Sequence, residues 1–187
     1  MENRRLLLLM GSETYRAKDF LQAAGRLGVE LIVGTDVEQP ASALRQDAVV
    51  ALPFHDLDSA TADILGLNER GLLAAVVSVD DSATVLAARA SAALGLPTNS
   101  VESTVSARNK YVFRQILNAA GLPQPEFRNL PLNVDVHAEA KVQRYPCVLK
   151  PLFLNASRGV IRADGPVQFV AAFERIAALL ADVDLQV

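Results

Sequence analysis

The side chains whose types and spacing could perform chemistry are concentrated between residues 145 and 160. A short apolar run there carries Lys150 and Pro151 at its end, and a small polar segment containing Ser157 and Gly159 follows. A lysine carried by a strand, beside a flexible turn of backbone N–H groups, suits binding of a nucleotide's phosphates. The segment is not a P-loop, because no Gly-Lys-Ser/Thr ends it and no helix is expected to start there. We therefore predict a phosphate site of another architecture.

Helices and a hairpin are expected to position this segment. Ser106 can cap a helix over residues 106–120, and a connector with three prolines follows that helix. Residues 148–153 are expected to form a strand, and residues 160–163 the returning strand of a hairpin. Residues 164–166 then begin a further helix. Its apolar residues recur at helical spacing: Phe169, Phe173, Ile176 and Leu180.

The first hundred residues alternate between short apolar runs and helical patterns. The apolar runs predict buried strands at residues 6–10, 29–33, 47–52 and 72–79. Helical patterns separate them, at residues 15–27, at residues 59–67 and in a segment that ends at residue 94. This alternation indicates a parallel sheet with helices on both faces. Ligands bind at the carboxyl ends of such strands, which here are Gly11-Ser12, Thr35-Asp36 and Asp80-Asp81.

Composition narrows the class of protein. The chain has 187 residues, 51% apolar and 21% charged, which suits one sizeable domain or a small domain with part of another. A net charge of −3, without a basic run, argues against a nucleic-acid partner. No apolar stretch approaches the roughly 20 residues that a membrane span needs. The single cysteine, Cys147, rules out an internal disulfide and is expected to be a packed side chain rather than a nucleophile. We expect a cytoplasmic protein.

Four motifs follow one another in the second half of the chain. They are Ala107-Arg-Asn-Lys110, Ala119-Ala-Gly-Leu-Pro-Gln-Pro125, Tyr145-Pro-Cys-Val-Leu-Lys-Pro151 and Asn155-Ala-Ser-Arg-Gly-Val160. In this order they resemble the ATP-grasp superfamily, in particular its carboxylate–amine ligases. The alternating unit before them, which ends in Ala-Leu-Gly-Leu-Pro-Thr-Asn99, is similar to the pre-ATP-grasp domain of those enzymes. Each motif alone is weak, whereas the four in order are strong.

The resemblance implies a set of ATP-binding residues. The lysines at the matching positions, Lys110 and Lys150, would contact ATP phosphates. A loop would close over the β- and γ-phosphates, and its residues are Asn155, Ala156, Ser157, Arg158 and Gly159. Two ammonium groups can neutralise a polyanion, each charge-assisted hydrogen bond contributing about 1.5–3 kcal/mol. The loop departs from the family pattern in its first half, where Leu154-Asn155-Ala156 replaces a stretch usually richer in glycine or serine.

The resemblance also implies an organisation and an activity. Residues 1–100 would be a Rossmann-like pre-ATP-grasp domain, and residues 101–187 a partial α+β first subdomain of the ATP-grasp domain. The family's Mg²⁺ ligands and adenine-hinge residues come later, so we expect an amino-terminal fragment that is inactive alone and holds no metal itself. The implied cofactors are ATP and Mg²⁺, and the implied partners are a small-molecule carboxylate and an amine. A homo-oligomer is left open.

The sequence also allows other functions for the chain and purely structural roles for several of the candidate site residues. Asp36 at the end of the second strand fits a nicotinamide-dependent oxidoreductase, but the turn after Gly11 lacks the Gly-x-Gly-x-x-Gly that such enzymes need. A non-catalytic nucleotide- or metabolite-binding module is a further alternative. Lys150 could simply extend into solvent, and Ser157 with Gly159 could form a plain hairpin turn. Asp81 is expected to cap a helix rather than to orient a substrate.

Overall fold

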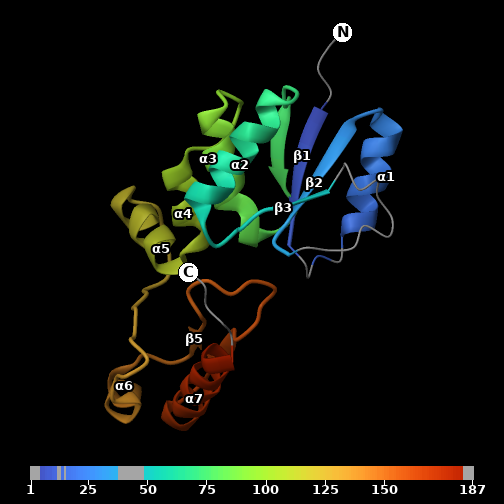
Figure 1. Ribbon diagram of the computed structural model, residues 1–187. Coiled ribbons are helices and arrows are strands. Elements are labelled where there is room, and N and C mark those ends of the chain that lie inside the picture. Colours follow the sequence, from blue (N-terminus) through green and yellow to red (C-terminus); the bar gives the residue numbers. More distant parts are fainter. Residues whose placement is uncertain (1–4, 12–13, 15, 38–48, 183–187) are drawn as a thin grey trace. The chain divides into compact units, whose positions relative to one another are not determined.

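The computed structural model describes residues 5–11, 14, 16–37 and 49–182. The chain divides into two compact units, Met1–Val105 and Ser106–Val187. Figure 1 colours them from blue to yellow-green and from yellow to red. The boundary falls within helix α4 (Val101–Arg108). Each unit is described by itself.

A parallel sheet forms the centre of the first unit. Its strands are β1 (Arg5–Met10), β2 (Glu30–Thr35), β3 (Val49–Ala51) and β4 (Ala75–Ser78), in the order β3-β2-β1-β4. All three strand pairs are parallel, and Leu7 lies opposite Ile32 on one side and Val76 on the other. The predicted α/β fold with a parallel sheet is therefore confirmed.

Helices cover both faces of this sheet, as Figure 1 shows. They are α1 (Ala17–Leu27), α2 (Leu57–Glu69) and α3 (Thr84–Ala93). Leu7 and Leu9 of β1 are fully buried in the cluster that includes α2 and α3, whereas Leu8 and Met10 pack with the apolar residues of α1. Successive side chains of a strand point to opposite faces, so the apolar run of β1 serves both layers.

The bounds of the elements in the first unit differ from the expected ranges: α2 extends beyond the expected residues 59–67 at both ends, whereas β4 is shorter than the expected strand 72–79. Residues 47 and 48 of the expected third strand lie outside the described residues, and so does residue 15 of the first helix. The expectation for Asp81 was wrong: Asp81 begins a 3-10 turn, Asp81–Ala83, and Ala83 precedes α3 without a side-chain cap.

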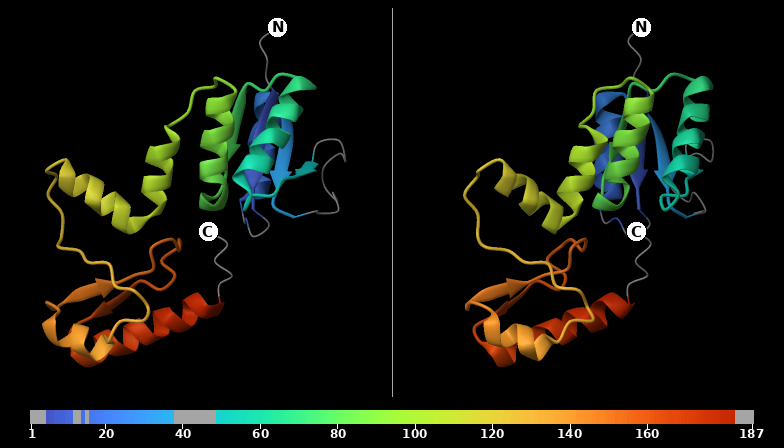
Figure 2. Two further views of the ribbon diagram at one scale, coloured as in Figure 1. Left: turned by 60° about the vertical axis from the view of Figure 1, so that its left-hand side comes forward. Right: turned by 90° about the vertical axis from the view of Figure 1, so that its left-hand side faces the viewer.

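The second unit is a two-stranded sheet covered by helices. Its elements are α5 (Lys110–Ala119), α6 (Val136–Val142), β5 (Cys147–Leu149), β6 (Ile161–Ala163) and α7 (Pro166–Asp182). The strands pair antiparallel, with Leu149 opposite Ile161. Ala140 of α6, Ala163 of β6 and Phe169 of α7 form the core of this unit. Figure 2 shows α6 and α7 on one side of the hairpin.

Two expectations for the second unit were wrong in detail, and one helix was missed. Ser106 lies inside α4 and does not begin a helix; Asn109 interrupts the chain with an extended backbone and caps α5. The strand expected at residues 148–153 ends at Leu149, so Lys150 follows the strand instead of lying within it. Pro151 has no N–H with which to continue the ladder. Helix α6 was not expected at all.

The close packing of Gly34 in β2 gives a test of the first unit. A Cβ atom built on Gly34 would lie 2.8 Å from both Leu52 Cδ1 and Leu9 Cδ2. Both leucines are almost completely buried and have little room to move. We expect Gly34→Ala to lower the free energy of unfolding by about 1–3 kcal/mol, measured by circular dichroism in urea.

The matched control is Gly66→Ala. Gly66 lies inside α2, and a Cβ atom there meets nothing within 4 Å. Because alanine is the better helix former, this variant is expected to raise the free energy of unfolding by up to about 1 kcal/mol. Equal effects of the two substitutions would contradict the packing described for β2.

Candidate functional site

The predicted phosphate-binding segment connects β5 to β6. Lys150 is exposed immediately after β5, and the buried Pro151 follows it. Leu154 is only 8% exposed and therefore holds the early part of the segment against the unit. Asn155, Ala156, Ser157 and Arg158 are all exposed. The segment thus has an anchored beginning and an accessible tip.

The backbone of this tip is tightly turned. Ala156 and Ser157 both have positive φ, 49° and 59°, and Gly159 has a φ of 72°. The N–H of Arg158 donates to the carbonyl of Asn155 at 3.0 Å, and the N–H of Val160 donates to that of Ser157 at 3.1 Å. Positive φ is unfavourable for Ala156 and Ser157, because their Cβ atoms approach the backbone. Residues 150–160 separate the two strands, so the connection is longer than a two-residue hairpin turn, and its tip has a specific, strained conformation.

Gly159 is required by its surroundings as well as by its backbone angle. A Cβ atom on Gly159 would lie 2.9 Å from Pro151 Cγ and 3.1 Å from Leu179 Cδ2. The glycine lets the end of the segment approach its beginning and the helix α7. Pro151 and Gly159, which both belong to the predicted motifs, thus close the base of the segment.

Lys110 contacts the same segment from α5. Its Nζ donates to the carbonyl oxygens of Leu154 at 2.7 Å and Leu152 at 3.1 Å. Its backbone N–H also donates to the Leu152 carbonyl, at 3.2 Å. Lys110 therefore lies beside the residues that directly follow Lys150. The structure brings the two predicted lysines to the base of one loop, with the Lys110 ammonium directed at backbone carbonyls.

Asn109 fixes the start of α5 and hence the position of Lys110. Its side-chain oxygen accepts from the N–H groups of Tyr111 at 3.0 Å and Val112 at 3.2 Å. These bonds satisfy donors that the first helical turn would otherwise leave unpaired. Sequence reasoning missed the role of Asn109, although Asn is one of the residues preferred before a helix and the residue stands in the motif itself.

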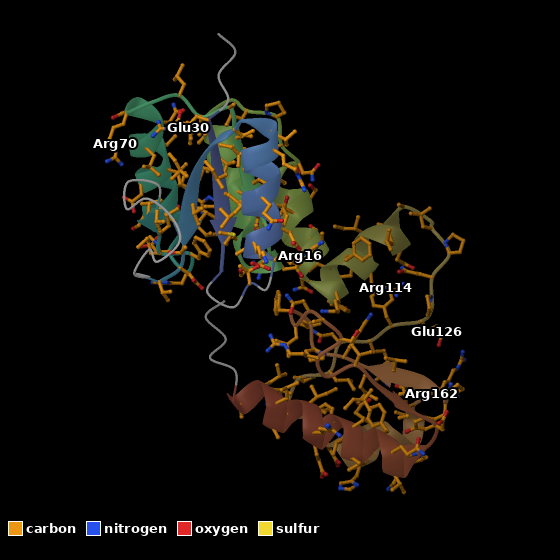
Figure 3. The ribbon with its side chains drawn as sticks, turned by 90° about the vertical axis from the view of Figure 1, so that its right-hand side faces the viewer. Arg16, Glu30, Arg70, Arg114, Glu126 and Arg162 are labelled. Atoms are coloured by element: carbon orange, nitrogen blue, oxygen red, sulfur yellow. The ribbon has the colours of Figure 1, made fainter. Side chains whose placement is uncertain are left out.

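Several charged side chains elsewhere in the second unit form ion pairs with one another. Arg162 Nη2 of β6 lies 2.7 Å from Asp164 Oδ1, and Arg144 Nη1 lies 2.9 Å from Glu126 Oε1. Arg162 and Glu126 are labelled in Figure 3. Both pairs are exposed, so each contributes little to stability. They also leave these arginines engaged outside the segment that follows Lys150.

The carboxyl end of the first unit's sheet gathers a second group of polar side chains. A Cβ atom on Gly11 would lie 3.2 Å from Ser82 Oγ and 3.8 Å from Asp36 Oδ2. Asp80 Oδ1 accepts from Thr14 Oγ1 at 3.2 Å. Asp80 Oδ2 is buried and has no hydrogen-bond partner among the residues that the structure describes. The expected rim is thus partly present, and Ser12 lies outside the described residues.

Cys147 behaves as a packed side chain. It lies in β5 against the core of the second unit. Burial, with the nearby negative charge of Asp164, raises the pKa of the Cys147 thiol. A raised pKa lowers the thiolate fraction at neutral pH, and the thiolate is the reactive form. This environment agrees with the expected structural role of Cys147.

Other features offer little chemistry. An open apolar hollow of about 350 Å³ lies between Leu6, Leu27, Val29 and Ala74, at the amino ends of the strands and away from the polar rim. Within the described ranges, no cluster of three or more His, Cys, Asp or Glu residues could hold a metal ion. Nor does any described helix have the length and apolarity to cross a membrane.

Comparison with protein families and known sequences gives consistent matches. Residues 21–98 match the model of the ATP-grasp N-terminal domain. The D-alanine–D-alanine ligase of Ralstonia nicotianae is 24% identical over 172 residues, covering 87% of this chain and 52% of that protein. The corresponding enzyme of Aromatoleum aromaticum is 26% identical over 163 residues, covering 82% of this chain and 52% of that protein. The chain thus spans about half the length of these curated relatives.

Solved structures share the fold. The L-amino acid ligase from Bacillus licheniformis has a TM-score of 0.71 and 23% identity, covering 94% of this chain and 43% of that one. The N5-carboxyaminoimidazole synthase from Aspergillus clavatus, solved with ADP and 5-aminoimidazole ribonucleotide, has a TM-score of 0.65 and 20% identity, covering 93% and 44%.

These matches confirm the resemblance found in the sequence motifs. Residues 21–98 match the ATP-grasp N-terminal domain, and the chain is similar in sequence to two D-alanine–D-alanine ligases over most of its length.

Proposed function

We propose that this chain is the amino-terminal part of an ATP-dependent ligase that joins a carboxylate to an amine. In this proposal residues 1–100 are the pre-ATP-grasp domain and residues 101–187 the first part of the ATP-grasp domain. The observation that carries the proposal is the meeting of Lys110 with the segment that follows Lys150. The motif that contains Lys110 thereby contacts the loop that follows the motif containing Lys150, although the bonded residues are 42 and 44 positions apart. The ligase names of the relatives supply the reaction class.

The proposed reaction has two steps. A carboxylate oxygen of one substrate attacks the γ-phosphorus of ATP, which forms an acyl phosphate and releases ADP. The nitrogen of the amine then attacks the acyl carbon, phosphate leaves, the nitrogen loses a proton, and an amide results. Phosphoryl transfer depends mostly on positioning and on stabilisation of negative charge. The chain's own contribution is therefore to bind and orient the triphosphate.

The residues proposed for that task lie around the β5–β6 loop. Lys150 is exposed and able to contact phosphate oxygens, and Lys110 adds a second positive charge at the base of the loop. The segment of residues 155–159, exposed from Asn155 to Arg158, would cover the phosphates, and Arg158 would extend from it. We propose that Mg²⁺ accompanies the ATP and is held by residues outside this chain.

Lys150→Ala is the first test of the phosphate site. Removal of one charge-assisted contact is expected to weaken ATP binding about ten- to hundredfold. The measurement is the KM for ATP and the rate of ATP-dependent phosphate release in the complete ligase. Lys141→Ala, which removes an exposed lysine from α6, is the matched control and is expected to change neither. An unchanged KM in Lys150→Ala would end the assignment.

Gly159→Ala tests whether the loop's closed base matters. The positive φ and the contact with Pro151 are expected to cost about 1–3 kcal/mol of folding free energy. We also expect a higher KM for ATP, because the end of the tip can no longer pack against Pro151. Gly165→Ala is the control, since a Cβ atom there meets nothing within 4 Å. The prediction fails if both variants unfold at the same urea concentration and bind ATP equally.

The fragment proposal has its own test. We expect the 187-residue chain alone to show no ATP-dependent amide formation and at most weak ATP binding, measured by calorimetry and by product analysis. Amide formation at a rate typical of enzymes, about 1 s⁻¹ or more, would refute the fragment proposal and leave the ligase class in place.

A further inference from the structure

Lys110 links two parts of the second unit through its side chain and its backbone. The ammonium donates to the carbonyls of Leu152 and Leu154, which lie 42 and 44 residues later in the chain. The backbone N–H of Lys110 donates to Leu152 as well. The side chain is partly buried at this point. These contacts are those of a structural cross-link between α5 and the segment that follows Lys150.

The cross-link sets the direction of two peptide groups. The carbonyls of Leu152 and Leu154 point at the Lys110 ammonium, and the peptide bonds that follow them are trans. In a trans peptide the N–H points opposite to the carbonyl of the preceding residue. The N–H groups of Phe153 and Asn155 therefore point away from Lys110. Asn155 is the first residue of the proposed phosphate loop.

The residues after this anchor need support from their surroundings. Ala156 and Ser157 come soon after Leu154 and hold positive φ without being glycine. Such a conformation persists only where neighbouring structure holds it. The Lys110 contacts at one end of the tip and the Gly159–Pro151 approach at the other are the supports on each side. Loss of either is expected to release the strained turn.

We propose that Lys110 is a positioning residue for phosphate binding. Its ammonium fixes the peptide groups at Leu152 and Leu154, so that the N–H of Asn155, the first residue of the tip, faces away from Lys110. Lys110 then acts on ATP affinity through the loop. The identification of ATP as the ligand rests on the proposed function, whereas the anchoring of the loop rests only on the hydrogen bonds of Lys110.

The test measures amide hydrogen exchange of the nucleotide-free chain by NMR. The probes are the N–H groups of Arg158 and Val160, which donate within the tip. Lys110→Met removes the ammonium and keeps the apolar stem. We expect exchange at both probes to become about tenfold faster, while amides in the middle of α7 keep their rates. Lys141→Met is the matched control and is expected to leave the probes unchanged.

Two further variants keep the outcome decisive. Lys110→Arg retains a cation with donors and is expected to restore much of the protection at Arg158 and Val160. Lys110→Gln, which is shorter and neutral, is expected to give an intermediate acceleration confined to the loop, and it replaces Lys110→Met if that variant unfolds. The proposal is overturned if the exchange rates of Arg158 and Val160 are unchanged in Lys110→Met, whatever happens to ATP affinity. If Lys110→Met unfolds, the same criterion applies to Lys110→Gln.

ATP titration of the complete ligase separates this proposal from the proposed function. Lys110→Met is expected to weaken ATP binding about tenfold, and Lys110→Arg to recover part of the loss. Faster loop exchange with unchanged ATP affinity would overturn the positioning role. If Lys150→Ala also bound ATP normally, the phosphate site itself would be wrong. Weaker binding in Lys150→Ala but not in Lys110→Met would leave the proposed function intact.

Discussion

The hydrogen bonds from the Lys110 ammonium to the β5–β6 loop are the interaction on which the candidate site depends. Helix α5 has no buried residue, so apolar packing does little to hold it in the second unit. Polar contacts attach it instead: Lys110 to Leu152 and Leu154, and Gln124 Nε2 to the carbonyl of Arg114 at 2.8 Å. An edge contact between the rings of Tyr111 and Phe127 adds to them. The site is therefore held together mainly by directional bonds.

The first unit is stabilised in a different way. Its central strand β1 has four consecutive buried residues, Leu7 to Met10, which feed the layers on both faces of the sheet. Because all strands are parallel, their carboxyl ends meet at one edge, and Gly11, Asp36 and Asp80 come together there. Burial of apolar surface thus fixes the polar rim, whereas the loop of the second unit depends on individual hydrogen bonds.

Local sequence pattern predicts the type and order of most elements, and it misses details that depend on the backbone's course in space. The parallel sheet is predicted by the apolar runs, and the hairpin by the turn residues between two short strands. Helix α6 has only seven residues, but Asp135 caps it by accepting from His137 and Ala138, a signal that the sequence contains. The cap of α5 was assigned to Ser106 instead of Asn109, since both residue types suit that position. The carbonyl partners of Lys110 could not be predicted, because they depend on a distance in space.

Those carbonyl partners also bear on how a lysine of a phosphate-binding motif can act. For Lys110 to contact a phosphate with the same protons, it would have to leave the oxygens of Leu152 and Leu154, which lie 3.1 and 2.7 Å away. The Leu152 carbonyl would keep the backbone N–H of Lys110 as a donor, whereas leaving the Leu154 carbonyl unpaired costs about 1–3 kcal/mol, comparable to the gain from one new charge-assisted bond. A cation that stays in place loses nothing and still attracts an anion at short range. The balance of these terms favours Lys110 acting from the base of the loop, with Lys150, exposed to solvent, as the residue that reaches the phosphates.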